Sequence, residues 1–151
     1  MYLEMEPRLE LNFLGGDPSK ICLKACNEGF AGETEQYINE KWLQVLIEQL
    51  YGFPKSSSDE VVFEVGEEGS TNGHCRLTFY CFDSAGHTAV IVSASNGIAG
   101  NVSSDNLCTA KFKVQFEASS LDIFTSSIKR ALEMGKGICK LKGINAYTQN
   151  I

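Results

Sequence analysis

The sequence of 151 residues has no long apolar run, only three prolines and only two histidines. Because no apolar stretch approaches about 18 residues, we expect no helix that crosses a membrane. The three prolines and 14 glycines are too few for a collagen-like or low-complexity chain. The chain also lacks the GxSxG, GxGxxG, GKS or GKT, and HExxH patterns, so the common hydrolase, dinucleotide, nucleotide and metalloprotease signatures are missing. No motif therefore predicts a cofactor or a metal.

What the sequence does contain is the composition of one globular domain. Hydrophobic residues make up 43% and charged residues 21% of the chain, which are ordinary values for a globular protein. A chain of this length buries roughly 70% of its unfolded surface, so it can form a core of its own. No repeat or linker divides it, and we expect a single domain over residues 1–151. The first residues, MYLEMEPRLEL, are acidic where an export signal would be basic and then apolar, which favours a cytosolic location.

Cysteine is present in an unusual number for such a chain. Six cysteines allow a disulfide framework, a zinc site or free buried thiols. Without an export signal disulfides are the weaker interpretation, and the spacing lacks the close pairs that zinc sites use. Cys22 and Cys26 would lie on the same face of a strand as small buried side chains. We therefore expect mostly free thiols at the six positions, Cys22, Cys26, Cys75, Cys81, Cys108 and Cys139.

Alternation of apolar and polar residues predicts strands over most of the chain. The clearest case is 111–118, where Phe112, Val114 and Phe116 alternate with polar residues. Such alternation is typical of an antiparallel sheet with one wet face and one covered face. We expect strands at 9–13, 20–26, 33–38, 61–65, 76–82, 88–94 and 111–118, with a short edge strand at 138–141. Lys140 and Lys142 would protect that edge from pairing with other chains.

Two segments have apolar residues at helical spacing instead. The first spans 40–51, begins after the potential cap Asn39, and has an apolar stripe that we expect in the core, made of Trp42, Leu43, Leu46, Ile47 and Leu50. The second begins at a Ser119–Asp122 capping box, ends at Gly135, and has a stripe made of Leu121, Phe124, Ile128, Ala131 and Leu132. The prediction is an α+β fold, a mostly antiparallel sheet of about six to eight strands with two amphipathic helices packed on one face.

Charge is distributed unevenly along the chain. Residues 28–68 contain ten acidic residues against two lysines, whereas residues 107–151 contain three acidic residues against seven basic ones. With a pI near 4.9, we expect no nucleic-acid or membrane partner, because like charges repel. Basic patches made of Lys111, Lys113, Lys140 and Lys142 are better explained as edge protection than as an anion site.

The acidic segment has two possible meanings. It can be a solvated face that keeps the protein soluble, or it can steer the protein to a basic partner. If the strands that carry them are neighbours, five carboxylates would form one patch for a protein partner: Glu33, Glu35, Glu64, Glu67 and Glu68. The sequence alone leaves both meanings open.

A small enzyme or ligand-binding domain is the alternative. The two histidines bracket one predicted hairpin, and a histidine beside an acid could activate a thiol. The residues of such a polar site would be His74, Cys75, Asp83 and His87. We expect no metal at this site, and turn histidines are more often plain surface residues.

The same hairpin carries a family resemblance. The run RLTFYCFDSAGHTAV at 76–90, the alternating strand at 112–118, the helix from Leu121 and the upstream piece GFAGETE at 29–35 resemble immunity proteins of bacterial polymorphic-toxin systems. The type is the WapI-like one, whose members accompany wall-associated, WapA-like toxins. The resemblance covers residues 20–135. It implies a non-enzymatic inhibitor that protects its own cell by binding a cognate toxin domain, many of which are basic nucleases.

Overall fold

The computed structural model describes residues 6–96 and 104–145. In these two ranges the chain forms eight strands, two α-helices and one short 3₁₀ helix, Ser104–Asn106. The strands are β1 (Arg8–Gly15), β2 (Ser19–Cys26), β3 (Ala31–Ile38), β4 (Glu60–Gly66), β5 (His74–Cys81), β6 (Thr88–Ser95), β7 (Thr109–Phe116) and β8 (Gly137–Lys142). The helices are α1 (Glu40–Leu50) and α2 (Ser120–Met134).

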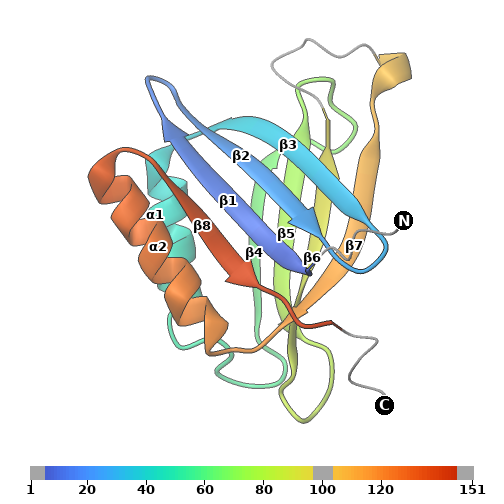
Figure 1. Cartoon of the computed structure of the whole chain (residues 1–151), viewed down its shortest axis with the longest axis vertical. Coiled ribbons are helices and arrows are strands. Elements are labelled where there is room, and N and C mark those ends of the chain that lie inside the picture. Colours follow the sequence, from blue (N-terminus) through green and yellow to red (C-terminus); the bar gives the residue numbers. More distant parts are fainter. Residues whose placement is uncertain (1–5, 97–103, 146–151) are drawn as a thin grey trace.

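The strands form two four-stranded sheets, in the orders β3-β2-β1-β8 and β4-β5-β6-β7. Every pairing in both sheets is antiparallel. The predicted α+β class and the antiparallel pairing are therefore confirmed. The eight described strands are divided between two sheets, which the sequence analysis had not distinguished (Figure 1).

The alternation of side chains along the strands places the core between the two sheets. In β4, Val61, Phe63 and Val65 are buried, whereas Glu60 and Glu64 are exposed. The same alternation in β1 and β7 buries the residues that face the opposite sheet, as expected for strands with one covered face. One hydrophobic cluster joins both sheets and both helices.

Strand β3 lies across the second sheet and contacts all four of its strands. The two sheets approach each other closely at Gly32, where an added Cβ would lie 3.1 Å from the Cβ of Ala110 and 3.7 Å from that of Ala94. Small residues on both sides allow this approach. Farther along β3, Thr34 and Gln36 also face inward and are buried, so polar side chains lie between the sheets there.

Helix α1 begins as predicted at Asn39, whose side chain accepts a hydrogen bond from the Lys41 amide at 3.0 Å. Its buried residues are Leu43, Leu46 and Leu50. Trp42 is 48% exposed, so the prediction that it belongs to the core was wrong. The reason is its direction around the helix axis. The buried face is centred on the three leucines, and Trp42 is rotated about 100° from Leu43, at the border of that face.

Helix α2 buries Leu121, Phe124, Ile128 and Ala131 and ends at Gly135, which has the left-handed conformation expected there. The predicted Ser119–Asp122 capping box is wrong, because the Ser119 side chain makes no capping hydrogen bond. Ser119 has helical backbone angles, so a tight turn leads into the helix instead. The two helices pack together beside β8 and β4 (Figure 1).

Two further expectations concern membranes and thiols. Within residues 6–96 and 104–145, no helix is both long and apolar enough to span a bilayer. All six cysteines are free, and four of them are buried: Cys22, Cys26, Cys75 and Cys139. Cys22 and Cys26 share a face as predicted, but it is the face of the first sheet that points away from the core.

Candidate functional site

The four residues of the predicted polar site are not brought together. His74 is the first residue of β5, whereas His87 directly precedes β6 at the other end of this hairpin. Seven residue steps of about 3.3 Å separate those ends by roughly 23 Å. Cys75 faces the core and is fully buried, on the opposite side of β5 from its neighbour His74.

Each histidine has its own carboxylate partner. His74 Nε2 lies 2.7 Å from Glu64 Oε2, and this histidine is only 2% exposed. His87 Nδ1 lies 2.6 Å from Asp83 Oδ2 on the exposed turn between β5 and β6. Hydrogen bonding to the His87 side chain is the main cause that lowers the pKa of Asp83 below its ordinary value. These are two separate pairs.

The thiols near these pairs are poor nucleophiles. Burial raises the pKa of Cys75 to about 12. The pKa of Cys81 is also raised, by desolvation first and then by the charges of Asp59 and Asp83. A catalytic thiol needs the opposite shift. In the part of the chain that the structure describes, no three His, Cys, Asp or Glu residues are placed to hold a metal ion.

On β3, the predicted acidic residues are already neutralised by lysines of β2. Glu35 lies 3.3 Å from Lys20 Nζ, and Glu33 lies 3.9 Å from Lys24 Nζ. These pairs follow from the register, because Lys24 is directly opposite Glu33, and Lys20 is two residues along β2 from Cys22, the partner of Glu35, and so lies on the same face. They are surface ion pairs, which contribute roughly 0–1 kcal/mol each.

The carboxylates at the end of β4 differ in whether they have a partner. Glu64 is bound by His74, as described above. Glu67 and Glu68 lie in the exposed turn between β4 and β5, where the Ser70 amide donates to the Glu67 carbonyl at 3.0 Å. Within residues 6–96 and 104–145, the side chains of Glu67 and Glu68 make no ion pair or hydrogen bond. Their charges are therefore open to a partner.

The two acidic segments meet in space at a groove between β3 and the end of β4. We call it the β3–β4 groove, a cavity of about 320 Å³ lined by Lys20, Glu35, Gln36, Tyr37, Trp42, Val65, Gly66 and Asn72. Trp42 and Tyr37 are 48% and 51% exposed, so two aromatic side chains border it. Glu67 and Glu68 directly follow Gly66. Residues of both segments thus line one groove, but of the five predicted carboxylates only Glu35 lines it.

A buried polar side chain also lines this groove. Gln36 is 6% exposed, and its Nε2 donates to the Thr34 hydroxyl at 2.9 Å. The Lys20 ammonium lies 6.0 Å from the centre of the Tyr37 ring, so one cation already contacts an aromatic wall here. Neither Gln36 nor the aromatic pair was predicted as functional. The position of Trp42 at the border of the helical stripe was the signal in the sequence.

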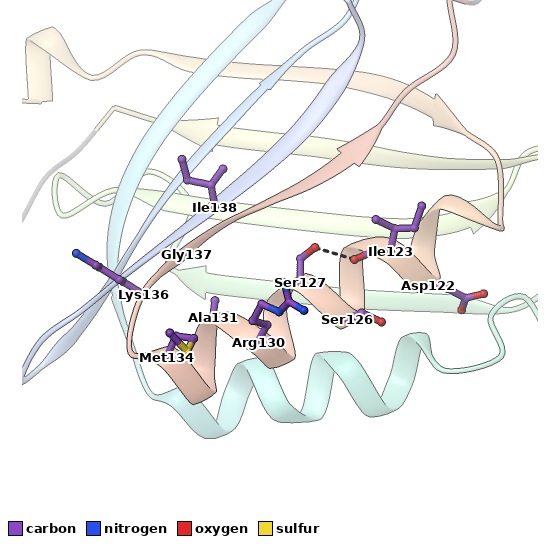
Figure 2. A pocket seen from close by; sticks show the side chains of 10 residues that line it. All are labelled: Asp122, Ile123, Ser126, Ser127, Arg130, Ala131, Met134, Lys136, Gly137 and Ile138. Carbon is purple, nitrogen blue, oxygen red and sulfur yellow. Dashed lines mark hydrogen bonds between the residues drawn. The ribbon is translucent and has the colours of Figure 1, made fainter.

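A larger cavity lies elsewhere, between α2 and the start of β8. This α2–β8 groove of about 780 Å³ is lined by Asp122, Ile123, Ser126, Ser127, Arg130, Ala131, Met134, Lys136, Gly137 and Ile138 (Figure 2). Ile123, Met134 and Ile138 are well exposed, and the Ser127 hydroxyl is bound to the Ile123 carbonyl at 2.8 Å. None of the buried polar residues lines it. It is an open amphipathic surface rather than a built polar site.

A third cavity, of about 280 Å³, lies beside His87. The His87 ring stacks on Phe82 with the ring centres 5.9 Å apart. Thr88 is the buried polar residue in its wall, and its hydroxyl already donates to the Phe116 carbonyl at 2.6 Å. This cavity therefore offers two exposed ionisable side chains, His87, which is held by Asp83, and Glu117.

Of the three cavities, the β3–β4 groove combines aromatic walls, a carboxylate and a buried amide. It is the candidate site. We found no family model that matches the sequence, and no similar protein among the curated proteins or the solved structures.

Proposed function

We propose that this chain is a non-enzymatic binding protein that captures a basic protein domain through the β3–β4 groove. The observation that carries the proposal is the meeting of two acidic segments beside two exposed aromatic side chains, Tyr37 and Trp42. Interfaces obtain most of their affinity from a few such anchors, in which Trp, Tyr and Arg are enriched. The surrounding carboxylates supply complementary charge for a cationic partner.

The most concrete partner is a toxin domain, and the chain would then be its immunity protein. The resemblance of residues 20–135 to WapI-like immunity proteins supports this choice. The acidic side of the groove would approach a positively charged cleft, such as the active site of a nuclease, and occlude it. Electrostatic attraction would speed the encounter, and its effect would decline with salt.

Glu67 and Glu68 are the best residues for testing the electrostatic part of this proposal. Both are exposed and unpaired among the residues that the structure describes, so their reversal should not disturb the fold. The matched control reverses Asp122 and Glu133 on α2, which are exposed and do not line the β3–β4 groove. Both double variants change the net charge by the same amount.

The experiment is a growth-protection assay with the C-terminal domain of the protein encoded immediately upstream. Co-expression of the chain should restore growth of cells that produce this domain. The Glu67→Lys, Glu68→Lys variant should protect less, whereas the Asp122→Lys, Glu133→Lys variant should protect fully. Equal protection by both variants would contradict the assignment of the binding surface, and no protection by the unmodified chain would contradict the proposed function.

A further inference from the structure

We infer that the β3–β4 groove receives an arginine side chain of the partner. The inference rests on the proposed function, and it names the group that the site recognises. The groove is lined by the amide of Gln36 on the inward face of β3, by Glu35 and Tyr37 on the outward face of this strand, and by Trp42 of α1.

The acceptor is the amide oxygen of Gln36. This side chain is 94% buried, and its one hydrogen bond among the described residues goes from Nε2 to Thr34. No completely inaccessible side-chain oxygen or nitrogen in the described ranges lacks a partner. Because Oε1 has none, it must open to the groove that Gln36 lines. Burying an acceptor without a donor is costly, so a ligand that donates there would be favoured.

Gly66 keeps the space beside this oxygen free. A Cβ at Gly66 would lie 3.5 Å from Gln36 Oε1, and it would also lie 2.5 Å from the Gly73 carbonyl oxygen. The backbone of Gly66 has φ of +81°, a conformation that favours glycine. A side chain is therefore excluded at this point, and the amide oxygen stays reachable.

The charge and the aromatic faces select a cation. Glu35 is paired with Lys20 at 3.3 Å, and that ammonium lies 6.0 Å from the centre of the Tyr37 ring, so an incoming cation would replace Lys20 at both groups. Trp42 is half exposed and borders the same groove. A positive group over an aromatic face gains about 0.5–2 kcal/mol, depending on how far it is desolvated.

Arginine fits this combination better than lysine. Its guanidinium is planar and has five donors, so it can stack on an aromatic ring and still donate hydrogen bonds from its edge. Lysine offers a compact point charge without a stacking face. A cavity of about 320 Å³ lies at the lower end of the range for small-ligand sites, about 300–1,000 Å³, which suits one side chain.

The test uses the fluorescence of Trp42, the single tryptophan of the chain. The probes are three capped pentapeptides of glycine and serine that carry arginine, lysine or citrulline at the centre. Citrulline has nearly the shape of arginine without its charge. The arginine peptide should change the emission saturably, at least fivefold more tightly than the lysine peptide, and the citrulline peptide should have no saturable effect.

Two matched variants locate the binding. Glu35→Gln should weaken the arginine peptide at least fivefold, whereas Glu33→Gln should leave it unchanged, because Glu33 is on the same strand face but does not line the groove. Gln36→Met, which keeps the size of the side chain but removes the acceptor, should also weaken it. Circular dichroism confirms that each variant is folded.

The inference is overturned if the arginine peptide gives no saturable change, if citrulline binds as well, or if Glu33→Gln weakens binding as much as Glu35→Gln. Such a result is distinct from failure of the proposed function. If the full toxin domain still binds and the Glu67→Lys, Glu68→Lys variant loses it, only the arginine anchor is rejected. If the toxin domain does not bind, the proposed function fails whatever the peptides do.

Discussion

Single carboxylates on this protein differ in whether the fold already neutralises them. Glu33 and Glu35 have lysine partners, and Glu64 has a buried histidine, whereas Glu67 and Glu68 have no partner among the described residues. Exposed ion pairs contribute little to stability, since solvent and salt screen them. The free carboxylates are therefore the ones that could act on the proposed partner without first breaking an ion pair of the fold.

Thiol reactivity is the second property of single residues, and it yields a prediction. Desolvation raises the pKa of Cys22 and Cys139 to about 11 and that of Cys75 to about 12, so these thiols stay protonated at pH 8. Cys108 is exposed. Because the thiolate is the reactive form, an aromatic disulfide reagent at pH 8 should modify Cys108 first in the native protein.

Absorbance of the released thiolate measures this reaction. The Cys108→Ser variant should lose the fast phase, and the buried cysteines should react only in denaturant. Rapid modification of Cys75 or Cys139 in the native protein, identified by peptide mass, would be inconsistent with their burial.

The turn before β6 permits a prediction about pH. The His87 side chain, followed by backbone amides, stabilises the charged form of Asp83 and lowers its pKa below 3.8. A lowered native pKa means that the stabilising effect is complete above the unfolded value and is lost as the pH falls through the native value. Carboxyl chemical shifts in an NMR titration should show this pKa, and His87→Ala should move it back towards 3.8. An unchanged value in that variant would show that the hydrogen bond is not the cause.

The two helices differ in how their N-termini are capped. The Asn39 side chain caps α1 through the Lys41 amide, whereas the Ser119 side chain makes no capping bond at α2. Asn39→Ala should therefore destabilise the protein by about 1 kcal/mol, and Ser119→Ala should cost less than about 0.5 kcal/mol. Urea unfolding of both variants measures the difference. Equal losses would contradict the assignment of the caps.

Helices and strands were predicted well where a local pattern of apolar residues determines which face is buried. The three leucines of α1 and the strand at 111–118 are examples, because their spacing alone fixes which side faces the core. Trp42 and Ser119 were misjudged for a physical reason. A side chain at the border of an apolar stripe can point either way, and a serine before a helix caps it only if its backbone leaves the helical conformation.

Packing of the two sheets is a property of the whole molecule, and Gly32 is a point where they approach closely. An added Cβ at Gly32 would approach Ala110 to 3.1 Å, whereas one at Gly29 would meet nothing within 4 Å. Gly32→Val should therefore destabilise the protein by about 1–3 kcal/mol through overpacking, while Gly29→Val should stay within about 0.5 kcal/mol. Thermal unfolding compares the two, and a neutral Gly32→Val would mean that the sheets can separate without cost.

The candidate site also depends on how the whole molecule is packed, and for this reason the sequence alone predicts only part of it. The excess of acidic residues in 28–68 was visible at once, but the groove forms because β3 crosses the second sheet and reaches the end of β4. Gln36 becomes part of it only through that crossing. The histidines show the reverse case, since residues that bracket one hairpin end up at opposite ends of a strand.

The central claim is that a basic protein domain docks on the β3–β4 groove, and hydrogen exchange of the backbone amides tests it most directly. The chain is measured alone and with the proposed partner, the C-terminal domain of the protein encoded immediately upstream, at low salt. The account predicts slower exchange at 35–42 and 66–73, which border the groove, and unchanged exchange at 122–138. Slower exchange confined to 122–138, beside the α2–β8 groove, would contradict it.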